Sequence, residues 1–291
     1  IPGNSALPND LLRPFPGYGG IRMWDYSGYG DYKALQTSVT RRFDRGLMLS
    51  GFWVWSKAQG INSTDAAAGV PNLSKEETKR LDYSLVDYDR THNFTVNAIY
   101  QTPIATSSRA LGLLVNEWQL SGIYRWTSGR PYTINFSIPG IGARNLTGTD
   151  GNPNARIAFT CDPGRGWSGD SYKQFANPEC FAPPQPGSKG DESPRFFARE
   201  PPLNNVDLSI AKNFSIAHGS KFEIRLDIFN ALNTVQFTTV NNTVNFRSLT
   251  DRTITNLPYD TTGALVQRNG FGTISGVAPP RTLQLVTRMT F

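Results

Sequence analysis

The stretch RTLQLVTRMTF, residues 281–291, decides the predicted fold because its polarity alternates with a period of two. One face of this extended segment would carry Leu283, Leu285, Met289 and Phe291, with Thr287 among them. The other face would carry Thr282, Gln284, Arg288 and Thr290, with Val286 as its apolar member. Such alternation is typical of a strand with one apolar and one polar side. The sequence stops on the aromatic Phe291 without a polar tail, so the last residue belongs to the same pattern.

The same alternation recurs upstream in six further segments, at 32–43, 47–57, 91–103, 117–129, 204–214 and 221–230. Most are about ten residues long, which is the length that a membrane-spanning β-strand needs. The connections are alternately short and long, and in an antiparallel sheet this places every short turn at one end. The sequence therefore predicts an all-β fold. It would be a fragment of an antiparallel transmembrane β-barrel, with short periplasmic turns and long extracellular loops.

Two details of this strand prediction can be checked in the structure. The tripeptide DRG at 44–46 is expected to close a three-residue hairpin that sets Phe43 opposite Leu47. The segment GGIRMWDYSGYG at 19–30 could add an eighth strand to the seven already recognised. A soluble β-sandwich also has short alternating strands, but its strands are usually shorter than these. Aromatic residues near the strand ends on the apolar face favour the barrel.

Composition excludes several other classes of protein. Only 38% of the 291 residues are hydrophobic, and no apolar run approaches the roughly 20 residues of a spanning helix. The net charge of +6 comes from scattered Lys and Arg residues, so no basic stripe indicates nucleic-acid binding. The chain begins at Ile1 without Met or a signal-peptide pattern, so either a leader was removed or the chain is a piece of a longer protein. We expect a piece, because the opening IPGNSALPNDLLRPFPGYGG is typical of a loop within a protein.

The two cysteines, Cys161 and Cys180, lie in one Gly- and Pro-rich stretch. They could be unrelated thiols, but their placement in one predicted loop favours a disulfide and an oxidising compartment. No Cys spacing typical of a metal site is present. DGNPN places Asp150, Asn152 and Asn154 at calcium-ligand spacing, but the Gly and Glu that complete an EF-hand loop are missing. We therefore expect a turn there, and neither a metal nor a cofactor.

Catalysis is not expected. His92 and His218 are the only histidines, and His92 follows Asp87 and Asp89 in the stretch DYDRTHN. A hydrolase would need such a His, its orienting carboxylate and a nucleophile assembled in space, which sequence proximity alone does not establish. We predict that the protein is not an enzyme.

Several stretches together resemble the C-terminal barrel of TonB-dependent outer-membrane receptors. They occur in the order YKALQTSVTRRFDRGLMLSGFWVWSK, DYDRTHNFTVNAIY, EWQLSGIYRWTSGRPYT, NVDLSIAKNFSI, FEIRLDIFNALNTVQF and RTLQLVTRMTF. The closest type is the Oar-like group, which carries an N-terminal carboxypeptidase-regulatory-like domain. The resemblance implies that residues 1–291 are the C-terminal part of one barrel domain in the bacterial outer membrane. The plug domain and the TonB-contacting segment would be absent, and the C-terminus would be periplasmic.

This resemblance also implies partners and a function, the import of a scarce solute. The barrel-assembly machinery would recognise the C-terminal strand through Leu285, Met289 and Phe291. Outer-membrane lipid would surround the barrel, and the TonB complex would act only through the missing N-terminal parts. A structural or adhesive outer-membrane protein and a small self-contained porin remain alternatives.

The polar strand faces would line the lumen, where most side chains are expected to stiffen the wall through cross-strand pairs. The long loop 130–202 is the expected substrate-facing part. The residues predicted to face a ligand are Arg125, Arg165, Trp167, Asp207, Glu223, Arg225, Asp227 and Arg288.

Overall fold

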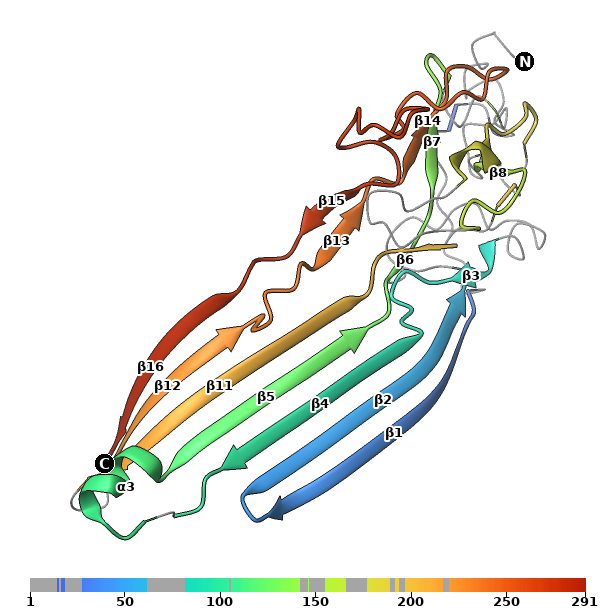
Figure 1. Cartoon of the computed structure of the whole chain (residues 1–291). Coiled ribbons are helices and arrows are strands. Elements are labelled where there is room, and N and C mark those ends of the chain that lie inside the picture. Colours follow the sequence, from blue (N-terminus) through green and yellow to red (C-terminus); the bar gives the residue numbers. More distant parts are fainter. Residues whose placement is uncertain are drawn as a thin grey trace.

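The structure is a computed structural model, and one large antiparallel sheet dominates it (Figure 1). It describes residues 15, 17–18, 28–61, 82–104, 106–141, 146, 155–165, 177–188, 192–193, 197–216 and 220–291. Most of the segment 19–30, the possible eighth strand, lies outside these residues. So do Trp167, His218 and the stretch 150–154.

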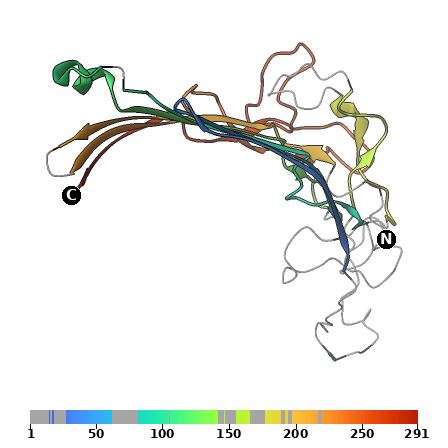
Figure 2. The same ribbon diagram turned by 90° about the horizontal axis from the view of Figure 1, so that it is seen from below.

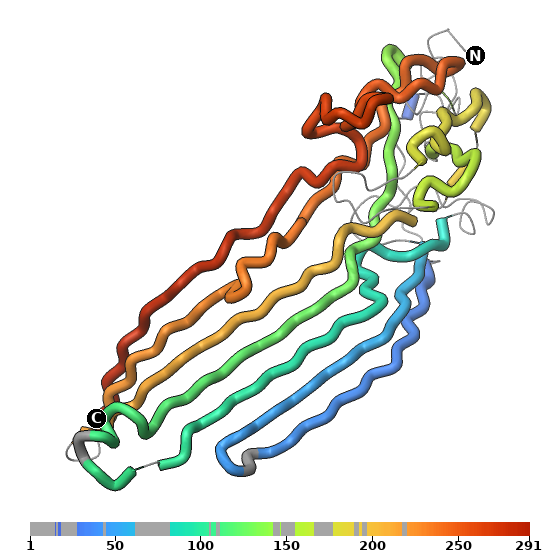
Figure 3. The backbone as a smooth tube through the Cα atoms, viewed as in Figure 1, coloured from blue at the N-terminus to red at the C-terminus, as the bar shows by residue number. Residues whose placement is uncertain are grey.

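The main sheet contains all seven predicted strands, in the order β1-β2-β4-β5-β11-β12-β16. Their bounds are β1 Gly30–Asp44, β2 Leu47–Gly60, β4 His92–Gln101, β5 Trp118–Thr127, β11 Leu203–Ser215, β12 Lys221–Phe229 and β16 Thr282–Thr290. The short strand β3 (Ser84–Leu85) pairs with the end of β2. Each strand lies beside the next long strand along the chain, as a meander of hairpins requires, and Figure 3 traces this path. The predicted all-β antiparallel fold is confirmed.

The cross-strand register gives the sheet one apolar and one mainly polar face. One continuous apolar row crosses six strands through Leu285, Leu226, Ile210, Leu120, Tyr100 and Leu47. The row next to it, on the other face, runs through Gln284, Asp227, Ser209 and Ser121 before it becomes apolar at Ile99 and Met48. Leu285 is 70% exposed, so the apolar face is an outer surface and not a packed core. Apolar side chains that face outward are typical of a membrane barrel wall.

The sheet is arched and open at both sides (Figure 2). β1 and β16 are the two edge strands, and they do not pair with each other. The short turns lie at the end where the C-terminus is found, and the long connections lie at the other end (Figure 1).

The β1–β2 hairpin differs from the prediction. Asp44, not Phe43, pairs with Leu47, and the register shifts between Arg41 and Asp44. Arg45 and Gly46 form a two-residue turn with φ angles of 50° and 83°. Two-residue turns with positive φ match the twist of the flanking strands, and a bulge in β1 accommodates its one extra residue. The expected three-residue hairpin was therefore wrong by one residue.

The connection between β4 and β5 contains a short helix, α3 (Arg109–Val115), which the sequence reading did not predict. Figure 2 shows this helix on the convex side of the arched sheet. Within the described ranges, no helix combines the length and the apolar character needed to cross a membrane.

The long loops contain eight short strands and a 3-10 turn. They are β6 Pro131–Tyr132, β7 Asn135–Ser137, β8 Ala158–Phe159, η1 Pro178–Cys180, β9 Phe181–Ala182, β10 Ala198–Arg199, β13 Phe237–Val240, β14 Thr243–Asn245 and β15 Ile274–Val277. The pairs β6–β10, β8–β9 and β13–β15 are antiparallel, whereas β7 and β14 pair in parallel. That parallel pair joins two loops that are far apart in the sequence.

These loops share a hydrophobic core of their own. We call the described parts of 130–202 and 231–281 the loop cap. Its buried residues are Tyr132, Ile134, Ile138, Leu146, Ala155, Ile157, Phe181, Ala198, Val244, Phe246 and Phe271. Because both loops contribute to this one cluster, the loop cap is a folded unit at the long-loop end of the sheet.

Candidate functional site

The mainly polar face of the sheet holds most of the predicted ligand-facing residues, and three of them bind one another. Arg225 Nε lies 3.1 Å from the Asp227 carboxylate, and its Nη1 lies 3.7 Å from Glu223 Oε1. Ser209 Oγ on the neighbouring strand β11 donates to Asp227 at 2.6 Å. The guanidinium charge is thus compensated within β12, whereas the sequence predicted pairs across strands; of these contacts, only the Ser209–Asp227 hydrogen bond joins two strands.

Asp207 also has a structural partner. Its Oδ1 accepts a hydrogen bond of 2.9 Å from the backbone N–H of Asn230, just beyond the end of β12. Asn230 has a φ of 50°, and its side chain bonds both the N–H and the carbonyl of Thr234 at 2.9 Å. Asp207 therefore helps to fix the turn that leads from the sheet into the loop cap.

Arg125 and Arg288 differ from Arg225 and Asp207 in that their side chains have no partner among the described residues. They lie on the same face as Arg225, but neither guanidinium group forms a hydrogen bond or ion pair with any residue that the structure describes. Arg288 stands opposite Glu223 in the register without an ion pair between them. Of the predicted wall residues, these two guanidinium groups remain available to a carboxylate or phosphate outside the wall.

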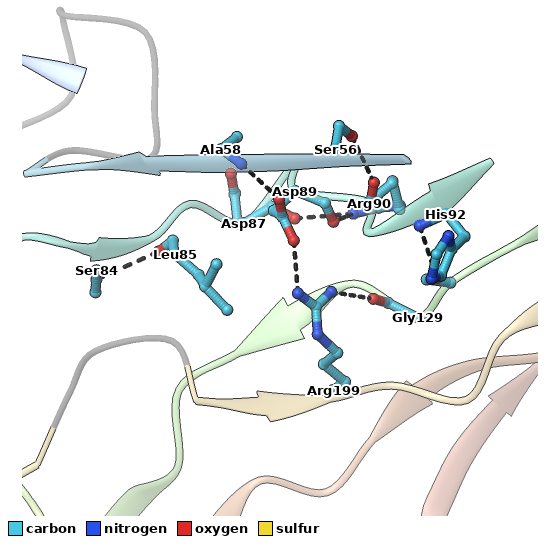
Figure 4. Close-up of polar contacts among 11 residues, drawn as sticks. Ser56, Ala58, Ser84, Leu85, Asp87, Asp89, Arg90, His92, Gly129 and Arg199 are labelled. Atoms are coloured by element: carbon cyan, nitrogen blue, oxygen red, sulfur yellow. Dashed lines mark hydrogen bonds and ion pairs between the residues drawn. The ribbon is translucent and has the colours of Figure 1, made fainter. Parts of the chain in front are cut away.

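A buried ion pair ties the loop cap to the sheet (Figure 4). The Asp89 side chain is fully buried, and its Oδ2 accepts from Arg199 Nη2 at 2.6 Å. Its Oδ1 accepts from the backbone N–H of Ala58 at 2.7 Å. Arg199 also donates to the Gly129 carbonyl at 3.0 Å. Asp89 and Arg199 thereby connect β2, the start of β4, the end of β5 and β10, and we call this arrangement the rim latch.

Two further arginines strengthen the same region. Arg130 Nη2 lies 2.8 Å from Glu200 Oε1, and this hydrogen-bonded partner raises the pKa of the Arg130 guanidinium. Arg156 pairs with the buried Asp82 and donates to the Ser193 carbonyl at 3.0 Å. The β2–β4 connection is thus joined to the loop cap at a second point.

Breaking the rim latch should loosen the loop cap. We expect Asp89→Ala to destabilise this end by about 2 kcal/mol, because the Ala58 N–H loses its acceptor and the Arg199 guanidinium loses its carboxylate. Arg199 keeps access to water at 31% exposure, which holds the cost below that of a fully buried pair. Hydrogen exchange at β10 amides would measure the change. If the double variant with Arg199→Ala costs as much as the two single variants added together, the two side chains are not coupled.

The predicted disulfide between Cys161 and Cys180 is confirmed, with a Cα–Cα distance of 4.9 Å. Cys180 is buried and directly precedes Phe181, a fully buried member of the loop-cap core. Beside the disulfide, the Asn177 side chain donates a hydrogen bond of 2.8 Å to the Arg165 carbonyl. This bond fixes the turn that follows Cys161. Arg165 thus lies on the disulfide-closed loop, whereas Trp167 is outside the described residues.

In the part of the chain that the structure describes, His92 packs among aromatic rings. Its ring lies on the outer face among three tryptophans, with centroid distances of 5.9 Å to Trp53, 6.4 Å to Trp55 and 6.3 Å to Trp126. In the described part of the chain, no hydrogen bond joins His92 to Asp87 or Asp89. This aromatic cluster resembles the interfacial girdle of a membrane barrel. No cluster of metal-ligating side chains occurs among the described residues either.

Of the predicted assembly residues, Leu285 and Met289 lie on the edge strand β16, and Phe291 directly follows its last residue. Leu285, Met289 and Phe291 are 70%, 50% and 91% exposed. They share the apolar outer face with β12, and among the described strands none pairs with the far edge of β16. Their recognition by an assembly machinery stays a prediction.

Comparison with known proteins gives one family. A family model described as an outer membrane beta barrel domain matches residues 1–284. Searches among curated proteins and among solved structures return no match to this chain. The matched range includes nearly the whole chain and agrees with the amphipathic antiparallel sheet. The chain therefore belongs to the outer membrane beta barrel domain family.

Proposed function

We propose that this chain is the C-terminal part of the barrel of a TonB-dependent receptor that imports a scarce solute across the outer membrane. The observation that carries the proposal is the open sheet, in which β1 and β16 lie at opposite edges with a mainly polar face between them. A barrel wide enough to hold a plug domain has about 22 strands, so an arc of this kind would form part of its wall.

Arg125 and Arg288 support the same proposal. A barrel wall that encloses a folded plug needs polar groups that can bind the plug. These two guanidinium groups have no partner among the described wall residues. Carboxylates of a plug would satisfy both through charge-assisted hydrogen bonds.

We infer the orientation from the connections. Short turns of outer-membrane barrels face the periplasm, so we place α3 and Phe291 on the periplasmic side and the loop cap outside the cell. The loop cap, with Arg165 on its disulfide-closed loop, would then meet the solute first. The barrel-assembly machinery would bind the strand that carries Leu285, Met289 and Phe291 from the periplasmic side. The TonB complex would act through segments upstream of this chain.

One observation favours a second candidate. The loop cap has its own buried core and a disulfide, as a surface-exposed adhesive domain would. A structural or adhesive barrel without transport therefore remains the alternative. A small porin formed by this chain alone is disfavoured, because β1 and β16 do not close the sheet.

Reading the coding sequence upstream of Ile1 and measuring conductance in planar bilayers would test the proposal. We expect an in-frame plug domain, and a complete protein that stays closed until urea loosens the plug. A signal peptide directly before Ile1, or steady conductance without urea, would contradict it. An upstream region of adhesive repeats without a plug would favour the surface protein.

A further inference from the structure

The helix α3 exposes apolar side chains at the short-turn end. Leu111, Leu113, Leu114 and Val115 are 57%, 52%, 70% and 45% exposed. Trp118 Nε1 donates to the Leu114 carbonyl at 2.7 Å, which holds the end of the helix against the first residue of β5. A short helix with this much exposed apolar surface is suited to the interface of a bilayer and not to water.

An apolar groove lies between α3 and the outer face of the sheet. It encloses about 380 Å³, and its apolar walls are formed by Leu113, Leu114, Trp118, Ile210, Phe214 and Ile224. The groove opens on the face that carries the apolar row across the sheet. In an outer membrane beta barrel domain this face meets lipid, so an acyl chain is the natural occupant.

Lys212 is an exception on this lipid-facing surface. It is only 7% exposed, and its Nζ donates to the carbonyls of Asn116 at 2.6 Å and Asn213 at 2.9 Å. The ammonium also lies 4.7 Å from the centre of the Phe214 ring. An ammonium has three N–H donors, and only two of these are used within the described chain.

A smaller polar pocket of about 210 Å³ adjoins the groove and shares Lys212, Leu113 and Phe214 with it. The Glu117 carboxylate lines this pocket, as do the hydroxyl-bearing residues Ser107 and Ser108. Glu117 is exposed, and among the described residues its carboxylate accepts only from Ser215 Oγ, at 3.2 and 3.4 Å. The site thus combines an apolar groove with one cation and one anion.

We propose that this site binds a phospholipid with an ethanolamine head group, from the leaflet nearest the short turns. One acyl chain fills the groove beside Trp118, the phosphate accepts the third N–H of Lys212, and the primary ammonium donates to Glu117. This pairing of charges distinguishes ethanolamine lipid from a purely anionic lipid, which would place no cation near Glu117.

Quenching of Trp118 by bromine-labelled lipids tests the proposal. The refolded full chain in detergent micelles is titrated with brominated phosphatidylethanolamine or brominated phosphatidylglycerol, and the signal of Trp118→Phe is subtracted. We expect half-maximal quenching at about fivefold to tenfold less phosphatidylethanolamine than phosphatidylglycerol, the effect of one charge-assisted hydrogen bond. Lys212→Gln should weaken quenching by both lipids, because both carry the phosphate.

The variant Glu117→Gln separates a specific site from ordinary annular lipid. Glu117 is exposed, so the substitution should leave folding intact while it removes most of the preference for phosphatidylethanolamine. Glu223→Gln, on the opposite face of the sheet, is the matched control and should keep the preference. Equal quenching by both lipids, stronger quenching by phosphatidylglycerol, or a preference that survives in Glu117→Gln would overturn the proposal.

Discussion

Phe246→Ala should destabilise the loop cap by about 3–5 kcal/mol, the usual cost of removing a buried aromatic ring. Phe246 is fully buried in the cluster that both long loops build, and its backbone N–H bonds the Ser137 carbonyl at 2.9 Å. The ring contributes dispersion contacts and buried area to both loops, so its loss should separate them. Hydrogen exchange at the amides of β7 and β14 would measure the free energy of this opening.

The destabilisation caused by Phe246→Ala should be confined to the loop cap. The main sheet keeps its own backbone ladders, so the exchange of β11 and β12 amides should not change. Phe229→Ala is the matched control, because its ring is 44% exposed and lies outside the loop-cap cluster. Unchanged exchange at β14 in Phe246→Ala would show that the buried cluster does not hold the loops together.

The strands could be predicted from sequence because their signal is local. In β16 and β12, alternate residues face the same side, and a window of ten residues contains the whole pattern. The turn at Arg45 and Gly46 was misjudged by one residue, since a bulge in the preceding strand leaves little trace in polarity.

The loop cap could not be predicted in the same way. Its parallel pair β7–β14 and its core depend on contacts between loops that are distant in the sequence, where apolar residues follow no regular period. The helix α3 has only seven residues, too few for a helical pattern to stand out.

The candidate site was predicted in part. Glu223, Arg225 and Asp227 were correctly placed on one face, since residues two apart on a strand share a face, but their pairing within one strand was not predicted. Asp89 was considered only as a neighbour of His92, whereas its partner Arg199 is 110 residues away. Only the fold brings the two together, and the sequence offered only an acidic residue three positions before an alternating strand.

Leu208→Arg should impair assembly of the sheet into a bilayer, with an expected cost of about 2–4 kcal/mol. Leu208 lies near the middle of β11 on the outer face, between Gly122 of β5 and Ile228 of β12. An arginine there must enter the hydrocarbon or bend towards an interface, and both cost free energy. The folded fraction after refolding into lipid vesicles, and the urea midpoint of that fraction, would measure the loss.

Ser121→Arg is the control, and comparing the two variants tests which face of the sheet contacts lipid. Ser121 lies on the opposite face at a similar depth, because it pairs with Ser209, the residue after Leu208. A guanidinium on that face reaches the polar lumen, so Ser121→Arg should refold with a midpoint close to that of the unaltered chain. If Leu208→Arg assembled normally and Ser121→Arg failed, the face assigned to lipid would be the lumen. The lipid site proposed beside α3 would then lose its basis, since Ile210 and Lys212 share the face of Leu208.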